Sequence, residues 1–181
     1  MKELSLNILD VAENSVKAGA ALTQLLLDQT ADRLTITIAD DGCGMDADTV
    51  ARVTDPFYTT RTTRSVGLGL PLLKLEAEMT GGSMTVESHT AASGEGDHGT
   101  TVTAVFYTDH IDCPPLGDLI PTVTTLIQGH PDTDFLLRHT RQSLPTVELD
   151  TRELRQVLEG VPLGSYEVLQ WIEGYLRDAY E

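Results

Sequence analysis

Three polar residues near the N-terminus have the spacing of a ligand-binding helix face. Asp10, Asn14 and Lys17 follow one another at intervals of four and three residues, so on a helix their side chains share one face. That face would present a carboxylate, an amide oxygen and a base among apolar neighbours. The solvated side of an ordinary amphipathic helix has the same composition, so the pattern gains meaning only together with other motifs.

A second candidate is the loop Asp40-Asp41-Gly42-Cys43-Gly44-Met45, which follows an apolar run. An Asp at the end of a buried strand can place its carboxylate against a flat polar ligand. The two glycines let backbone and ligand approach closely. Because Asp-Gly is also common in plain turns, a simple turn is the alternative interpretation.

A third candidate is Gly67-Leu68-Gly69-Leu70, which opens a helical segment that continues to Met79. The free N–H groups and the positive dipole end of a helix favour phosphate. Arg61 and Arg64 precede this turn in a segment without clear periodicity, which we expect to be a mobile loop. Alone, two glycines before a helix are weak evidence, but three such features in this order are not.

The elements that would position these residues can be predicted from hydrophobic periodicity. A helix is expected over residues 4–18, ended by Gly19. Strands are expected over 22–28 and 34–38 as an antiparallel pair, and over 83–88 and 100–107. Short helices are expected over 46–53 and 67–79.

The pattern changes after Tyr107. Pro114-Pro115 indicates a linker or rigid turn, followed by a helix over 116–128. A hairpin is expected over 135–139 and 146–149, and helices over 152–158 and 166–180. We therefore predict two parts, a nucleotide domain at 1–107 and an α+β extension at 108–181. The aromatic residues of the last helix either pack the terminal helices or bind a partner.

Composition excludes several classes of function. The chain has 181 residues, 40% of them hydrophobic, two cysteines and a formal net charge of −16. So acidic a surface repels phosphate backbones and disfavours nucleic-acid binding. No apolar stretch is long enough for a membrane span, and no signal peptide is evident. We expect a cytoplasmic protein with no nucleic-acid or membrane partner.

Taken together, the motifs resemble the GHKL ATPase superfamily, which unites DNA gyrase, the ninety-kilodalton heat-shock chaperone, sensor histidine kinases and MutL. Five segments carry the resemblance, in order along residues 4–107: the N-box at 9–20, the DxGxG box at 40–44, the F-box at 55–61, the second glycine box at 67–70 and a final box at Gly99-Thr100. The resemblance implies the Bergerat fold, an α+β two-layer sandwich. Its sheet is mixed and mostly antiparallel, with helices on one face.

The resemblance also implies ATP and Mg²⁺ as cofactors. Asn14 would ligate Mg²⁺, Lys17 would contact phosphate, and Asp40 would accept a hydrogen bond from the adenine amino group. Mg²⁺ takes few protein ligands when a triphosphate completes its shell. The other residues implied at the nucleotide are Gly42, Gly44, Met45, Arg61, Arg64, Gly67, Leu68, Gly69, Leu70 and Thr100.

Two residues depart from the family pattern. Ser65 occupies the position of the first glycine in the GxGLGL motif. Asp10 stands where gyrase, MutL and the anti-sigma kinases have a Glu, one methylene longer. A general base must come within about 3 Å of the group it deprotonates, so Asp10 is a candidate base whose shorter arm puts hydrolysis in doubt.

Two functions stay open. The chain most resembles a histidine kinase ATP-binding domain, and we expect no phosphoacceptor His domain of its own. The first hypothesis is a stand-alone kinase or ATPase that acts on a separate protein. The alternative is a non-hydrolysing module in which ATP controls partner binding through residues 108–181. Pairing with a second copy of the chain also stays open.

Overall fold

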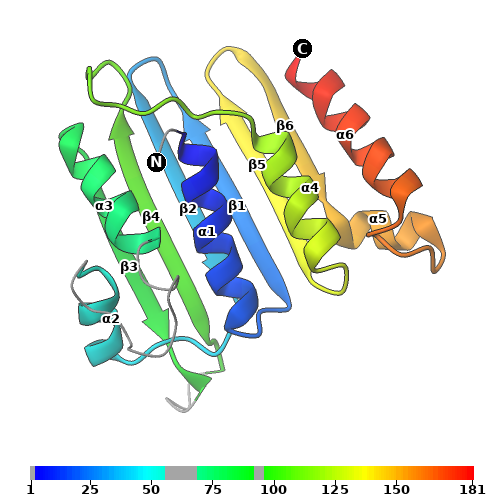
Figure 1. Ribbon diagram of the computed structural model, residues 1–181, viewed down its shortest axis with the longest axis horizontal. Coiled ribbons are helices and arrows are strands. Elements are labelled where there is room, and N and C mark those ends of the chain that lie inside the picture. The colour runs from blue at the N-terminus through cyan, green and yellow to red at the C-terminus, as the bar shows by residue number, and fades with distance from the viewer. Residues whose placement is uncertain (1–2, 56–68, 92–95) are drawn as a thin grey trace.

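The sheet at the centre of the molecule is built from residues at both ends of the chain. The computed structural model describes residues 3–55, 69–91 and 96–181. Within them, six strands form one sheet in the order β3-β4-β2-β1-β5-β6 (Figure 1). The strands are β1 (Leu22–Gln29), β2 (Arg33–Asp40), β3 (Ser83–His89), β4 (Gly99–Tyr107), β5 (Asp134–Arg141) and β6 (Leu144–Asp150).

Neighbouring strands run antiparallel, except that β1 and β5 are parallel. The β2–β4 register sets Asp40 opposite Thr100. The last residue of β2 therefore lies beside the start of β4, at the end of the sheet where the Asp40–Met45 loop begins. This register brings two motifs together that are sixty positions apart in the chain.

The helices α1 (Leu4–Lys17), α3 (Gly69–Met79), α4 (Leu119–Gly129) and α6 (Tyr166–Tyr180) lie across one face of the sheet. Figure 1 shows α1, α3 and α4 in front of the strands and α6 beside β6 at the edge. The short helix α2 (Ala47–Val53) lies near the end of β3, and α5 (Thr151–Leu158) joins β6 to α6. The fold is thus a two-layer sandwich.

Alternating residues of the strands face the helices and form the core. Leu25, Ile36, Ile38 and Phe106 keep 1% or less of their surface exposed. They belong to one buried cluster with Leu4 and Ile8 of α1 and with apolar residues of α3, α4 and α6. Burial of such side chains stabilises the fold by about 1.5–3 kcal/mol for each residue. The apolar faces of the strands and helices therefore pack against each other and hold the sheet and the helix layer together.

The α+β sandwich with a mixed, mostly antiparallel sheet is confirmed. The structure adds that β5 and β6 extend the same sheet, because β5 pairs with β1 along its whole length. The predicted boundary after residue 107 therefore falls within one continuous sheet, and the division into two functional parts stays a prediction.

The proline-containing segment after β4 is tied to the start of α1. The N–H groups of Leu4 and Ser5 donate to the carbonyls of Pro115 and Leu116 at 2.9 and 2.8 Å. These bonds satisfy two of the N–H groups that a helix leaves without partners in its first turn. Within the part of the chain that the structure describes, no helix is both long and apolar enough to cross a membrane.

Candidate functional site

The predicted polar face of α1 lies on its outer side. Asn14 is half-buried, whereas Asp10 and Lys17 are exposed. Lys17 sits in the last turn of α1, where a positive charge stabilises the helix dipole. The inner side of the same helix is closed by Ile8 and Ala12, which are fully buried, so the three polar side chains share the accessible face.

The start of α3 approaches this face directly. A Cβ added to Gly69 would lie 3.4 Å from Asp10 Cβ and 3.9 Å from Asn14 Nδ2. Gly69 begins α3, so the helix end that favours anions is adjacent to a carboxylate and an amide. The structure thus brings Asp10, Asn14 and Gly69 together, although the chain separates them by more than fifty residues.

The carboxylate of Asp40 is held by three donors. Ser15 Oγ donates to Oδ2 at 2.7 Å, and the N–H groups of Gly42 and Thr100 donate to Oδ1 at 2.9 and 3.3 Å. Donors to a carboxylate stabilise its charged form. Because Ser15 follows Asn14 on α1, this network joins α1, β2 and β4 at one point.

Two glycines allow the backbones around Asp40 to approach closely. At Gly42 a Cβ would lie 2.9 Å from Ala18 Cβ and 3.0 Å from Asp40 Oδ1. At Gly99, whose φ is +139°, a Cβ would lie 1.9 Å from the carbonyl oxygen of Asp40. Any larger residue at Gly42 or Gly99 would therefore displace the Asp40 loop.

The remainder of the loop is fixed from both sides. The Cys43 N–H donates to Ala18 O at 2.9 Å, and Asp41 Oδ1 accepts from the N–H groups of Ala21 and Leu22. His98 Nδ1 lies 2.5 Å from the carbonyl oxygen of Gly42. The turn between α1 and β1 thus anchors the loop that carries Asp40.

Gly44 and Met45 lie beside β3. Gly44 has a φ of +71°, and a Cβ there would lie 1.9 Å from the carbonyl oxygen of His89. The Met45 N–H donates to Ser88 Oγ at 2.7 Å. Ser88 Oγ also lies 2.7 Å from Thr100 Oγ1. Ser88 therefore links the far end of the loop to the strand that carries Thr100.

Partial burial raises the pKa of the Asp10 carboxyl above its ordinary value. Lys17 opposes this rise through its positive charge, and Glu13 adds to it through its negative charge. A carboxyl whose pKa is raised holds a proton more readily, which suits a group that accepts a proton during a reaction.

Five of the residues predicted to contact the nucleotide are either buried in the core or outside the described residues. The side chain of Leu70 is 8% exposed and belongs to the core, so only its backbone is available to a ligand. Arg61, Arg64, Gly67 and Leu68 lie outside the described residues.

Sequence reasoning did not single out Ser15, Asp41 and Ser88, which fix the loop. Ser15 could have been found, because it follows Asn14 and would lie on the side of the helix toward the sheet. The contacts of Ser88 and Asp41 depend on strand register and a turn, which the sequence pattern does not reveal.

Comparison with known proteins gives a family and several relatives. The family model described as "Histidine kinase-, DNA gyrase B-, and HSP90-like ATPase" matches residues 1–110. The chain is 38% identical over 96 residues to the heme sensor protein HssS of Staphylococcus saprophyticus, covering 51% of this chain and 20% of that protein. It is 31% identical over 86 residues to the sensor histidine kinase CitA of Klebsiella pneumoniae, covering 46% and 16%. The chain thus spans a fifth or less of these relatives.

Two solved structures share the fold beyond the family match. The ATPase domain of Aquifex aeolicus MutL, complexed with ADP, superposes with a TM-score of 0.58 at 13% identity, covering 88% of this chain and 70% of that one. The N-terminal domain of a DNA repair protein superposes with a TM-score of 0.57 at 16% identity, covering 83% and 53%. Likeness at such low identity is a likeness of fold.

Proposed function

Because the chain belongs to the family of histidine kinase-, DNA gyrase B- and HSP90-like ATPases, we propose that it binds ATP with Mg²⁺ between α1, the Asp40 loop and the start of α3. We further propose that it acts as a regulatory kinase or ATPase on a separate protein. The relatives that it matches are sensor proteins much longer than this chain, so substrate and partner belong to the proposal.

The observation that carries the proposal is the set of donors to Asp40, which among the described residues numbers three. A carboxylate has about four lone-pair sites, and Ser15, Gly42 and Thr100 fill three of them. The remaining site, on Oδ2, suits one N–H donor of a flat base such as the amino group of adenine. The absence of side chains at Gly42 and Gly99 supports this, because the loop backbone stays open to a planar ligand.

The arrangement of Asn14 and Gly69 supports a triphosphate nearby. Mg²⁺ prefers oxygen ligands and keeps several waters, so one amide oxygen from Asn14 suffices when phosphate oxygens complete its shell. Bound Mg²⁺ would neutralise phosphate charge and orient the phosphates. The N–H groups at the start of α3 would receive phosphate oxygens. Lys17, Arg61 and Arg64 are the bases proposed to add to this binding.

Transfer of the terminal phosphate would need a base, and Asp10 is the candidate. Asp10 shares the α1 face with Asn14, its Cβ lies close to Gly69, and its carboxyl has a raised pKa. A hydroxyl or water near Gly69 would lose its proton to this carboxylate while the phosphates are held by α3.

A second candidate function is an ATP-controlled switch without phosphate transfer. Among the bonds that join the proposed nucleotide half to the extension, two start close to the proposed site, and they favour the switch. The Asp134 N–H donates to Ala21 O at 2.9 Å, next to the residues that Asp41 anchors. His130 Nε2 lies 2.9 Å from Glu13 Oε2 on α1. Movement of α1 or of the Asp40 loop would therefore reach the extension.

The two functions are distinguished by following the γ-phosphate. Purified protein is incubated with γ-labelled ATP, Mg²⁺ and a host-cell extract, in parallel with Asp10→Asn. Label on another protein, or free labelled phosphate, that disappears with Asp10→Asn supports a kinase or ATPase with Asp10 as base. Retention of all label on bound ATP supports the switch. No ATP binding at all would contradict both.

The metal assignment has its own test. Asn14→Ala should remove the Mg²⁺ dependence of ATP binding, because it removes the proposed protein ligand. ATP titrations with Mg²⁺ and with chelator measure this dependence. Gln24→Ala, which removes a half-buried amide on β1, is the matched control. Equal Mg²⁺ dependence in Asn14→Ala and in the unmodified protein would contradict the assignment.

A further inference from the structure

The last helix carries two exposed aromatic rings beside the edge strand β6. Trp171 and Tyr175 keep 54% and 40% of their surface exposed. They are four residues apart, and their rings stack with centroids 5.3 Å apart and an interplanar angle of 9°. Figure 1 shows α6 beside β6, at the edge of the molecule far from α3. Of the two explanations for the aromatic residues, internal packing does not account for this pair.

The aromatic pair is held in place before any partner arrives. The Tyr175 hydroxyl donates to the carbonyl oxygen of Glu148 on β6 at 2.9 Å. This bond fixes the Tyr175 ring against the strand, and stacking then fixes the ring of Trp171. Rigid aromatic groups lose little side-chain entropy on binding, so they suit a contact surface.

Gly174 lies on the same face, three residues after Trp171. A Cβ there would meet no atom of the chain within 4 Å, so internal packing does not require glycine. In a helix interior, Gly costs about 1 kcal/mol relative to Ala. The missing side chain leaves the surface beside the Trp171 ring open, and a ligand would use that space.

The charges around the pair are negative. Glu167 is four residues before Trp171 and Asp178 three residues after Tyr175, so both carboxylates flank the rings on the same face. Both are exposed, and neither forms an ion pair within the described part of the chain. The aromatic pair therefore lies between two carboxylates that are accessible to a cation.

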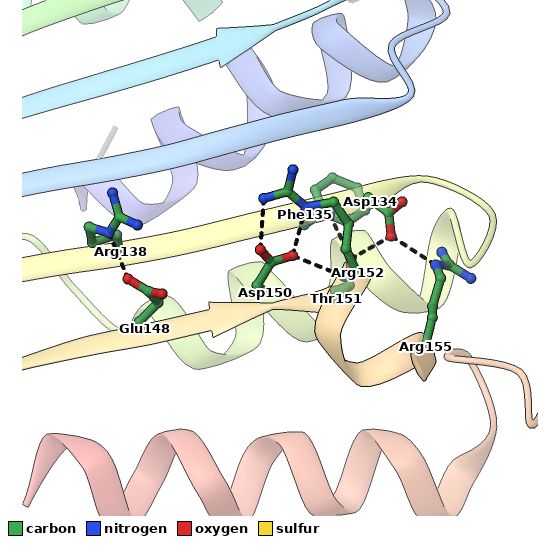
Figure 2. A network of polar contacts seen from close by, with 8 residues as sticks. All are labelled: Asp134, Phe135, Arg138, Glu148, Asp150, Thr151, Arg152 and Arg155. Atoms are coloured by element: carbon green, nitrogen blue, oxygen red, sulfur yellow. Dashed lines mark hydrogen bonds and ion pairs between the residues drawn. The ribbon is translucent and has the colours of Figure 1, made fainter. Parts of the chain in front are cut away.

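The arginines of this region cannot neutralise those carboxylates, because each is engaged elsewhere. Residues 108–181 contain five arginines and no lysine. Figure 2 shows Arg138 with Glu148, Arg152 with Asp150 and Arg155 with Asp134. Arg177 pairs with Glu173, and Arg141 lies 5.1 Å from the centroid of the Tyr180 ring and donates to two carbonyls.

We propose that the face formed by Glu167, Trp171, Gly174, Tyr175 and Asp178 binds a basic segment of a partner protein. A Lys or Arg side chain of that segment lies over the Trp171 ring, where the π-face attracts a cation, and its charge is balanced by the two carboxylates. The same charges repel nucleic acid, anionic membranes and a second copy of this face. The inference deepens the partner part of the proposed function and does not depend on ATP binding.

Trp171 is the chain's single tryptophan, so its fluorescence reports directly on the surface. The probe is a short amphipathic peptide with arginines along one face, titrated without nucleotide. A matched peptide carries glutamate in place of arginine. We expect a saturable change in Trp171 emission with the arginine peptide alone, weakened by salt. An equal response to the glutamate peptide, or no response to either, overturns the proposal.

Three variants separate recognition from simple charge attraction, with binding read from anisotropy of a labelled arginine peptide. Trp171→Ala should weaken binding by at least about tenfold, as truncation of an aromatic anchor does. Gly174→Ala should weaken binding while raising the melting temperature, because it fills the open space and favours the helix. Tyr166→Ala, which removes another exposed aromatic ring of α6, should leave binding unchanged.

Unchanged binding by Trp171→Ala would show that net charge alone attracts the peptide, and would overturn the proposal. The unmodified protein is also titrated with anionic vesicles and duplex DNA and centrifuged at rising concentration. A Trp171-dependent response to vesicles, to DNA or to a second copy of the chain would overturn the proposal, because that partner and not a basic segment would then bind this face. ATP titrations of the same variants keep this result separate from the nucleotide site.

Discussion

The polar groups have different partners on the two sides of the β1–β5 pairing, that is, around β4, β2 and β1 on one side and around β5 and β6 on the other. On the β4-β2 side, Asp40 accepts from the N–H groups of Gly42 and Thr100, and nearby glycines leave no room for a Cβ. On the β5-β6 side, the arginines of β5 and α5 pair with carboxylates of β5 and β6 (Figure 2). One side packs backbone closely around a carboxylate, and the other pairs its arginines internally and exposes aromatic rings instead.

The two sides of the one sheet therefore differ in what stabilises them. Close backbone packing fixes the geometry of the Asp40 loop, where we propose the nucleotide binds, and it leaves little room for larger side chains at Gly42, Gly44 and Gly99. Internally paired charges on β5 and β6 stabilise the frame of the extension and leave α6 free to present a surface. The bonds from Asp134 to Ala21 and from His130 to Glu13 join the two sides.

The largest expected effect contrasts the tolerance of the two sides for a Cβ. Gly99→Ala should lower the free energy of unfolding by about 2–4 kcal/mol, because its Cβ would lie 1.9 Å from a carbonyl oxygen at a φ of +139°. Gly129→Ala on α4 should be neutral or stabilising, since a Cβ there meets nothing within 4 Å. Urea unfolding measures both, and equal losses would contradict the contrast.

The second effect belongs to the extension and depends on pH. His139 is 2% exposed, with Nδ1 3.0 Å from the Tyr180 hydroxyl and Nε2 3.0 Å from Gln29 Oε1. Burial, with a contribution from Arg141, lowers its pKa to about 4. Unfolded chains take up this proton near pH 6.5, so its contribution to stability is present above that pH and is lost toward pH 4.

We expect this contribution to be roughly 2 kcal/mol. It is measured as the difference in pH dependence between the unmodified protein and His139→Gln in urea unfolding from pH 7 to pH 4. His110→Gln, which changes an exposed histidine, is the control. Identical slopes for the unmodified protein and His139→Gln would contradict the assignment of a buried neutral histidine.

The smallest effect tests the connection between the two sides. The Glu13–His130 pair is partly exposed, with 30% and 29% of the side-chain surfaces accessible, so its coupling energy should be about 0.5–1 kcal/mol. A double-mutant cycle with Glu13→Gln and His130→Ala measures it. Additive losses would mean that this pair does not contribute to the connection between the two sides.

Periodicity was sufficient to predict the helices and strands, whereas the two-layer sandwich was implied by the family resemblance. Alternation over residues 34–38 and helical spacing in 4–18 specify which faces are buried, and the structure places Ile36, Ile38, Leu4 and Ile8 in one core. The superfamily resemblance was predicted from motifs in order, and the family match over residues 1–110 confirms it. The continuous sheet was not predicted, because the parallel β1–β5 pairing joins segments that more than one hundred residues separate.

The site was predicted only in part, for a physical reason. Asp10, Asn14 and Asp40 were singled out because their residue types and local spacing carry a signal, and their role at a ligand stays a prediction. The roles of Ser88 and Asp41 come from strand register and from the turn at Ala21, which are tertiary features. The exposure of Trp171 and Tyr175 likewise depends on how α6 packs beside β6.

The central claim, an adenine-nucleotide site at Asp40, is tested most directly by calorimetric titration of ATP with Mg²⁺. The unmodified protein is compared with Asp40→Asn and with Asp32→Asn, which removes the same charge from the β1–β2 turn. We predict that Asp40→Asn weakens ATP binding by roughly 1.5–3 kcal/mol, the range for a hydrogen bond to a charged group, and that Asp32→Asn binds normally. Equal affinity in a folded Asp40→Asn protein would contradict the account.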